Sequence, residues 1–128
     1  MSTSTMLRNR YVTDSVQTMS PARAVVALYE RMILDLERAE AAIHGEDIVA
    51  AHGALIHAQQ ILVELLGSLD TQRWAPAAHL ASIYRFAINE LVSANVRKDA
   101  GKVVACRTML EPLRDAWREA AGIVGKAA

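Results

Sequence analysis

The stretch that decides the fold is IVAAHGALIHAQQILVELLGSL, residues 48–69. Its apolar residues recur at alternating steps of three and four, through Ile48, Ala51, Leu55, Ala58, Leu62, Leu65 and Leu69. That spacing places every member on one face of an α-helix, where the residues form a continuous seam for packing against other helices. The sequence therefore predicts a long helix from about Asp47 to Leu69, buried along one face.

Three further segments carry the same helical spacing. The first begins at Ser20-Pro21, because Pro is preferred at the first helical position, and it ends before Gly45, which favours a left-handed C-cap. The other two begin near Pro76 and at Asp99. Four long helices joined by short connections predict an all-α fold, an antiparallel up-down four-helix bundle with a short N-terminal cap helix.

Length and composition favour a single soluble domain. The chain has 128 residues, of which 52% are hydrophobic and 22% charged, so it can bury a core and is not a disordered chain. We expect the bundle to occupy residues 20–121, with residues 1–19 as a cap segment and residues 122–128 as a flexible tail. The formal net charge of zero argues against a nucleic-acid partner.

Targeting signals are not evident in the sequence. The N-terminus lacks the apolar core of a secretory signal peptide. The run from Ile48 to Val63 has 16 residues without a charge, and we take it as too short and too polar to span a bilayer. These observations predict a cytoplasmic protein without membrane insertion.

Charged residues are scarce in the middle of the chain. Residues 48–96 hold five of the 28 charged residues, a density of about 10% against about 29% elsewhere. A surface helix of a soluble bundle carries charge on its water-facing side, whereas residues 47–69 place Ile56, Ile61 and Val63 beside the seam. Packing in a wide core explains such residues one by one. For the surface as a whole we favour an exposed apolar groove for a partner, with Ile56 or Ile61 exposed.

The residue pattern does not indicate an enzyme. There is no glycine-rich phosphate loop, and His52 and His57 lie about 140° apart around a helix, too far to share a metal ion. Cys106 falls on a core seam, where a buried small residue is expected rather than a nucleophile. We therefore predict no catalytic residue, cofactor or metal. The alternative is a histidine phosphotransfer domain using His79. Such sites place a lysine close to the histidine, and the helical turn after His79 contains none.

Four different blocks of residues follow one another along the chain. They are Tyr11-x4-Val16-x-Thr18-Met19-Ser20-Pro21 with Leu28-Tyr29-Glu30, Ala58-Gln59-Gln60-Ile61-Leu62-x-Glu64-Leu65 with Ser68-Leu69-Asp70, Leu80-x-x-Ile83-Tyr84 with Leu91-x-x-Ala94-Asn95, and Leu113-Arg114-x-Ala116-Trp117. Together they resemble the flagellin-specific export chaperones of the FliS family over about residues 11–117. The chain departs from that family at Met19, Ala24 and Glu30 and in the loop after Asp70.

This resemblance implies a cytoplasmic chaperone that binds the disordered C-terminal segment of flagellin. Such a chaperone prevents premature polymerisation of flagellin and assists its delivery to the flagellar type III export apparatus. The export gate and other flagellar regulators are further implied partners. Together with the charge-poor surface, the resemblance predicts partner contacts at Leu7, Tyr11, Val16, Tyr29, Ile56, Gln60, Ile61, Ile83, Tyr84 and Asn95.

Overall fold

The computed structural model describes residues 21–123, so the predicted cap segment, residues 1–19, lies outside the described residues. Within this range the chain forms four helices and no strand. The helices are α2 (Pro21–His44), α3 (Ile48–Gly67), α4 (Ala77–Arg97) and α5 (Ala100–Ala120). Their bounds agree with the predicted segments to within a few residues, and the prediction of an all-α four-helix bundle is confirmed.

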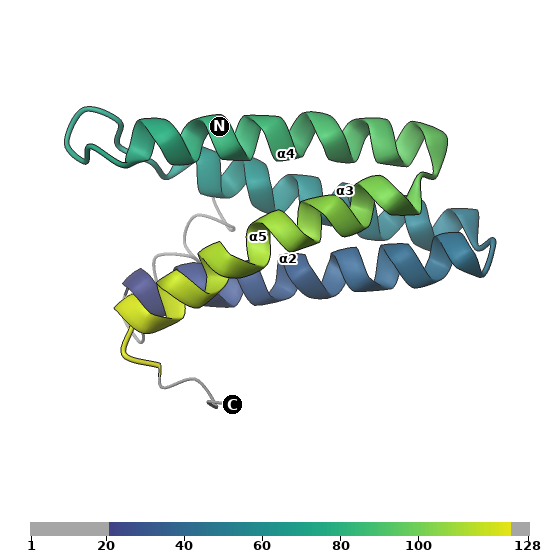
Figure 1. Ribbon diagram of the computed structural model, residues 1–128, viewed down its shortest axis with the longest axis horizontal. Coiled ribbons are helices and arrows are strands. Elements are labelled where there is room, and N and C mark those ends of the chain that lie inside the picture. The colour runs from purple at the N-terminus through teal and green to yellow at the C-terminus, as the bar shows by residue number, and fades with distance from the viewer. Residues whose placement is uncertain (1–20, 124–128) are drawn as a thin grey trace, which may run out of the picture.

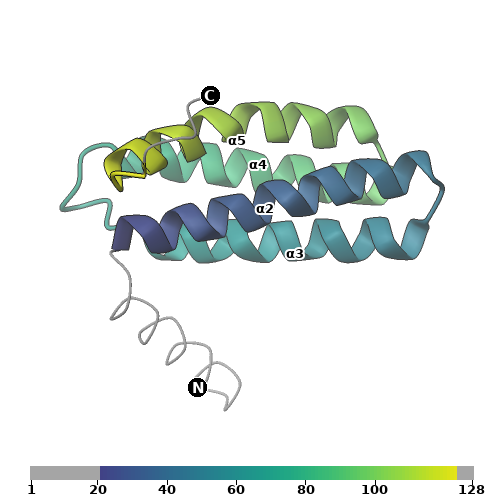
Figure 2. The same ribbon diagram turned by 90° about the horizontal axis from the view of Figure 1, so that it is seen from below.

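The four helices pack side by side as a closed ring. The helix α2 contacts α3 and α5, and α4 contacts the same two helices (Figure 1). The start of α2, the end of α5 and the loop of residues 68–76 gather at one end of the bundle, which we call the loop end (Figure 2). The two short turns, between α2 and α3 and between α4 and α5, lie at the opposite turn end. Because neighbouring helices alternate in direction, the topology is up-down.

The seam of α3 lies at the centre of the core. Its members Ala51, Leu55, Ala58, Leu62 and Leu65 are all buried. The two outer members of the predicted seam differ from this. Ile48 is exposed at the start of the helix, and Leu69 lies beyond its end. The other helices complete the core with Tyr29, Met32, Leu36, Tyr84, Leu91, Val103 and Leu110. Burial of these side chains supplies most of the favourable free energy of folding.

The helix α3 also has the length and composition of a membrane span. It has 20 residues and a mean hydropathy of 1.3 over its most apolar window. The expectation that its uncharged run is too short to cross a bilayer was therefore wrong as to length. In the bundle, however, α3 packs between α2 and α4, and 33% of this apolar stretch is buried.

One carboxylate is buried beneath the surface of the bundle. Asp35 of α2 is 2% exposed, and its Oδ2 contacts Nδ1 of His57 on α3. The Nε atom of Arg31 lies 3.4 Å from the other carboxylate oxygen. A charge is tolerated at such depth when it is paired, so this contact also fixes α2 against α3.

The turn between α2 and α3 differs from the prediction. The residue with positive φ is Glu46, at 58°, and not Gly45. The amide of Gly45 still donates to the Ala41 carbonyl at 2.9 Å, so helical hydrogen bonding continues one residue further and the reversal falls on Glu46. The Asp47 amide then reaches back to the Ala42 carbonyl at 2.8 Å, as in a Schellman motif.

Replacement of Glu46 by glycine should stabilise the fold by about 0.5–1 kcal/mol, because glycine adopts a positive φ without the steric cost of a Cβ atom. Urea unfolding measures the change. Glu37→Gly is the matched control, since Glu37 is exposed within α2, and it should destabilise the fold by about 1 kcal/mol. A less stable Glu46→Gly variant would contradict a strained turn.

Candidate partner-binding site

Exposed large apolar side chains gather on two of the helices. Of the eight such residues in the described part of the chain, six belong to α3 or α4: Ile48, Val49, Val63, Phe86, Val92 and Val96. Val49 and Val96 are 84% and 81% exposed. In addition, Glu64 is the only charged residue in α3. The charge-poor apolar surface predicted from the sequence is therefore present on the outside of α3 and α4.

A shallow hollow of about 490 Å³, which we call the α3 groove, follows the outer face of α3. It is lined by Ile56, Gln59, Gln60, Val63, Glu64 and Gly67. A Cβ atom added at Gly67 would meet nothing within 4 Å, so the groove is open at that end. Ile56 and Gln60, two of the predicted contacts, thus lie in one hollow.

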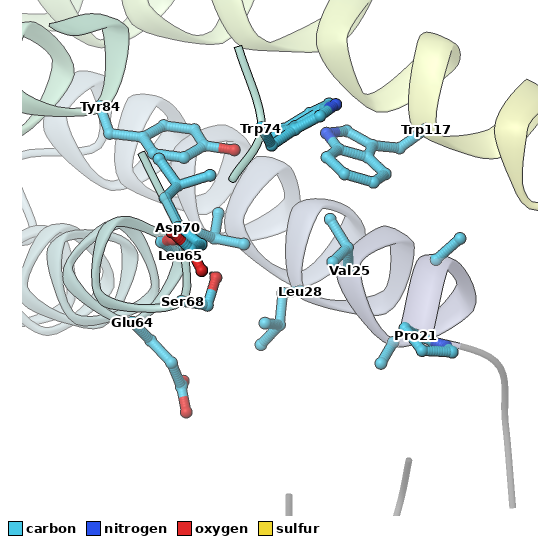
Figure 3. Close-up of a pocket in the computed structure, with 13 residues that line it drawn as sticks. Pro21, Val25, Leu28, Glu64, Leu65, Ser68, Asp70, Trp74, Tyr84 and Trp117 are labelled. Atoms are coloured by element: carbon cyan, nitrogen blue, oxygen red, sulfur yellow. Dashed lines mark hydrogen bonds between the residues drawn. The ribbon is translucent and has the colours of Figure 1, made fainter. Parts of the chain in front are cut away.

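A second hollow, of about 440 Å³, opens at the loop end and is called the end pocket (Figure 3). Its walls come from the start of α2, the end of α3, the following loop, and one residue each from α4 and α5. They are Pro21, Ala22, Ala24, Val25, Leu28, Glu64, Leu65, Ser68, Leu69, Asp70, Trp74, Tyr84 and Trp117. Most of these side chains are apolar, so the end pocket suits an apolar side chain of a partner.

The loop of residues 68–76 places an indole at the wall of the end pocket. The Oδ1 atom of Asp70 accepts hydrogen bonds from the Gln72 and Arg73 amides, both at 3.1 Å, and its carbonyl accepts from the Trp74 amide at 3.2 Å. The Trp74 ring then lies beside Trp117, with ring centroids 6.0 Å apart and a tilt of 55°. Trp74 remains 43% exposed and can therefore contact an incoming side chain.

Two buried tyrosines meet beneath the end pocket. The hydroxyls of Tyr29 on α2 and Tyr84 on α4 are hydrogen-bonded at 2.6 Å. Burial raises the pKa of both phenols above their usual value, and neither ionises near neutral pH. We expected both as partner contacts, but the side chains are buried, since each satisfies the hydroxyl of the other in the core. Only Tyr84 also lines the end pocket.

Other predicted contacts lie away from the two hollows. Ile61 is 4% exposed and belongs to the core, because α3 packs against both α2 and α4 and its buried arc is wide. The expectation that at least one of Ile56 and Ile61 is exposed was therefore wrong, because Ile61 is buried and Ile56 is partly buried. Ile83 is also partly buried and packs against the core. Leu7, Tyr11 and Val16 lie outside the described residues.

Asn95 lies at the turn end, far from the end pocket. Its side-chain amide donates to Nδ1 of His52 at 3.0 Å, and its side-chain oxygen accepts from Nζ of Lys98 at 2.7 Å. These contacts join α3 to α4, and the residue is buried. The structure therefore does not bring Asn95 together with the other predicted contacts.

Sequence reasoning missed most of the residues that line the end pocket. Leu28, Leu69 and Trp117 appeared only as helical core, and Trp74 only as part of an altered loop. A tryptophan in a polar loop was the one local signal of a surface site. The pocket itself could not be inferred from spacing, because it joins the ends of elements that are distant in the chain.

The histidines and the cysteine form no catalytic group. Within residues 21–123 there is no cluster of three His, Cys, Asp or Glu side chains that could hold a metal ion. His79 is exposed in the first turn of α4, but Lys98 lies at the far end of that helix, about 28 Å away at ~1.5 Å per residue. Lys102, the other lysine in this range, pairs with Glu90 at 3.1 Å. Among residues 21–123, therefore, no lysine lies where the phosphotransfer alternative would need one.

The described residues form a four-helix bundle with a shallow groove along α3 and a mostly apolar pocket at its loop end. The sequence matches the family described as "Flagellar protein FliS" over residues 4–124. The chain belongs to the FliS family, as the sequence blocks predicted.

Three relatives carry the name flagellar secretion chaperone FliS. The protein of Bacillus subtilis strain 168 is 29% identical over 110 residues, which cover 86% of this chain and 82% of the relative. That of Campylobacter jejuni is 29% identical over 112 residues, covering 87% and 88%. That of Salmonella typhimurium is 28% identical over 110 residues, covering 84% and 82%. These names denote chaperones and not enzymes, in agreement with the prediction.

A solved structure described as a flagellar chaperone from bacteria has the same fold. The two chains align with a TM-score of 0.73 at 19% identity, and the alignment covers 91% of this chain and 96% of the other. The bundle architecture is therefore shared with that protein.

Removal of either hydroxyl of the Tyr29–Tyr84 pair should leave the other hydroxyl buried without its tyrosine partner, with only the indole of Trp117 nearby. Tyr29→Phe and Tyr84→Phe should each lower the free energy of unfolding by about 1–3 kcal/mol, and the double variant should lose little more than one of them. Urea denaturation of the four proteins gives the coupling. Additive losses would show that the hydroxyls do not depend on each other.

Cys106 should titrate only at high pH in the folded protein. Burial, with a smaller contribution from nearby Glu90, raises the pKa of its thiol from 9.0 to about 11. The folded state therefore disfavours the thiolate, and this contribution to stability should be complete below pH 9 and disappear as the pH rises toward 11. Unfolding measured across this range should show a steeper loss than in Cys106→Ala, and equal slopes would contradict the raised pKa.

Proposed function

We propose that this protein is a cytoplasmic export chaperone that binds the C-terminal segment of flagellin with defined stoichiometry. Binding keeps flagellin from polymerising before export and assists its delivery to the flagellar type III export apparatus. Family membership and the names of the relatives support a flagellar secretion chaperone. The export gate and other flagellar regulators are proposed as further partners.

The observation that carries the proposal is the apolar surface of α3 and α4 with its two hollows. A disordered segment can fold against such a surface as amphipathic helices, each placing apolar residues in the hollows. The free energy then comes from burial, which needs no nucleotide and no turnover. This is the physical requirement of a chaperone that holds an export substrate.

The predicted contacts enter the proposal according to where they lie. Ile56 and Gln60 contact flagellin through the α3 groove, while the buried ring of Tyr84 only shapes the wall of the end pocket. Leu7 and Tyr11 stay in the proposal on the resemblance alone, as does Val16. Pro21, at the start of α2, lines the end pocket, so these residues precede its edge in the chain.

Titration calorimetry with a peptide of the last forty or so flagellin residues tests the proposal. Binding coupled to folding should bury roughly 1,000–3,000 Å² and give a clearly negative heat-capacity change. Because the surface carries few charges, the affinity should depend weakly on salt. A loss of about tenfold or more at high salt, with little heat-capacity change, would mean that an electrostatic site elsewhere binds the segment.

Acidic substitutions in the α3 groove test where the segment binds. Val63→Asp and Ile56→Asp should weaken peptide binding by about tenfold or more, because each buries a carboxylate against apolar partner residues. Leu34→Asp is the control, since Leu34 is exposed on α2 outside both hollows.

Thermal melting checks that the variants fold. Val63 is 56% exposed, so its substitution should leave the melting temperature within a few degrees. Wild-type affinity in a folded Val63→Asp variant would contradict binding in the α3 groove. Loss of folding in Ile56→Asp alone would assign that side chain to the core.

A further inference from the structure

The two hollows meet at a single residue. Glu64 is the one side chain that lines both the end pocket and the α3 groove. In Figure 3 its side chain lies at the edge of the end pocket and its carboxylate points away from Trp74 and Trp117. A partner helix that follows the α3 groove into the end pocket therefore passes over Glu64.

The charged residues that line the two hollows are all acidic. Glu64 is the only charged residue of the α3 groove, and the end pocket adds only Asp70. Asp70 is already engaged, because it accepts two amide hydrogen bonds in its loop and lies 3.6 Å from Nε of Arg73. Within residues 21–123, in contrast, the carboxylate of Glu64 forms no hydrogen bond or ion pair.

An acid in this position favours a cation. The side chain of Glu64 is partly buried at the edge of the mostly apolar end pocket, where water screens a charge less than on an open surface. Acidic and aromatic side chains of a partner would meet a like charge or leave the carboxylate unpaired. A lysine or arginine close to apolar residues satisfies both the carboxylate and the pocket.

We propose that Glu64 determines the register of the partner by pairing with one lysine or arginine of the bound segment. The apolar residues next to that cation fill the end pocket beside the paired rings of Trp74 and Trp117. This inference rests on the proposed function, since the segment is that of the export substrate. It adds a specificity-determining residue to a surface that is otherwise apolar, and apolar contacts alone define register poorly.

The two tryptophans give an optical signal for the pocket. The chain has two tryptophans, and both line the end pocket. Because Trp74 is half-exposed, an apolar side chain that enters the pocket should remove water from its ring. Peptide binding should then shift the tryptophan emission to shorter wavelength and protect it from acrylamide.

The test uses the full chain and the peptide of the last forty or so flagellin residues. Glu64→Gln should weaken binding about threefold to fivefold, as for a partly exposed ion pair, and Glu64→Lys about tenfold or more. In a peptide series, each lysine or arginine is replaced singly by glutamate. One of these peptides should bind Glu64→Lys more tightly than the parent peptide does. Glu37→Gln and Glu37→Lys are the matched controls, because Glu37 is exposed on α2 and lines neither hollow.

Each other outcome overturns the inference. The inference is overturned if the peptide binds the Glu64 variants as tightly as it binds the wild-type chain. It is also overturned if the variants bind more weakly and no charge-reversed peptide restores the affinity. Both results leave the proposed function intact. If the tryptophan emission of the free chain already lies at the shorter wavelength and the peptide does not change it, residues 1–20 and not the peptide occupy the end pocket. A shift that follows protein concentration without peptide shows that a second copy fills it. Failure of the wild-type chain to bind the peptide overturns the proposed function as well.

Discussion

The buried hydrogen bond between Tyr29 and Tyr84 is the contact on which core and surface both depend. It joins α2 to α4, two helices that lie on opposite sides of the ring and do not otherwise pack together. Each hydroxyl would be costly to bury alone, so the bond fixes both rings at one depth in the bundle. Tyr84 is also a wall of the end pocket, and the shape of that pocket thus follows from the centre of the core.

Ion pairs divide the bundle into a charged side and an apolar side. Arg107 donates to Glu40 at 2.6 Å and Arg118 to Glu30 at 3.2 Å, so α5 is joined to α2 by charges at two levels. No comparable pair joins the outer faces of α3 and α4 among the described residues. That side holds most of the exposed large apolar side chains of residues 21–123, together with the carboxylate of Glu64, which pairs with no other residue in this range.

The shape of the loop end follows from local hydrogen bonding as much as from packing. Asp70 organises the loop after α3 and thereby places Trp74 beside Trp117. A change in this segment alters one wall of the end pocket while the helical core stays the same, which is a route to different partner preferences on one fold.

The sequence by itself determined the four helices and much of the core. The three–four spacing from Ala51 to Leu65 requires a helix with one buried face, and Asp99 caps α5 by accepting from the Lys102 amide at 3.2 Å. These are local properties of the chain. The scarcity of charge in residues 48–96 is a property of composition, and it likewise indicated an apolar surface.

Only the tertiary structure decided which apolar residues are buried and which are free. Ile61 and Val63 are two residues apart and look alike in sequence, yet one is in the core and the other is exposed. Helical geometry turns the two side chains about 160° apart, so they cannot share one face, but how far the buried arc extends on either side of the seam depends on how α2 and α4 meet α3. The end pocket has the same origin, because its residues belong to four helices and a loop and become neighbours only when the ring closes.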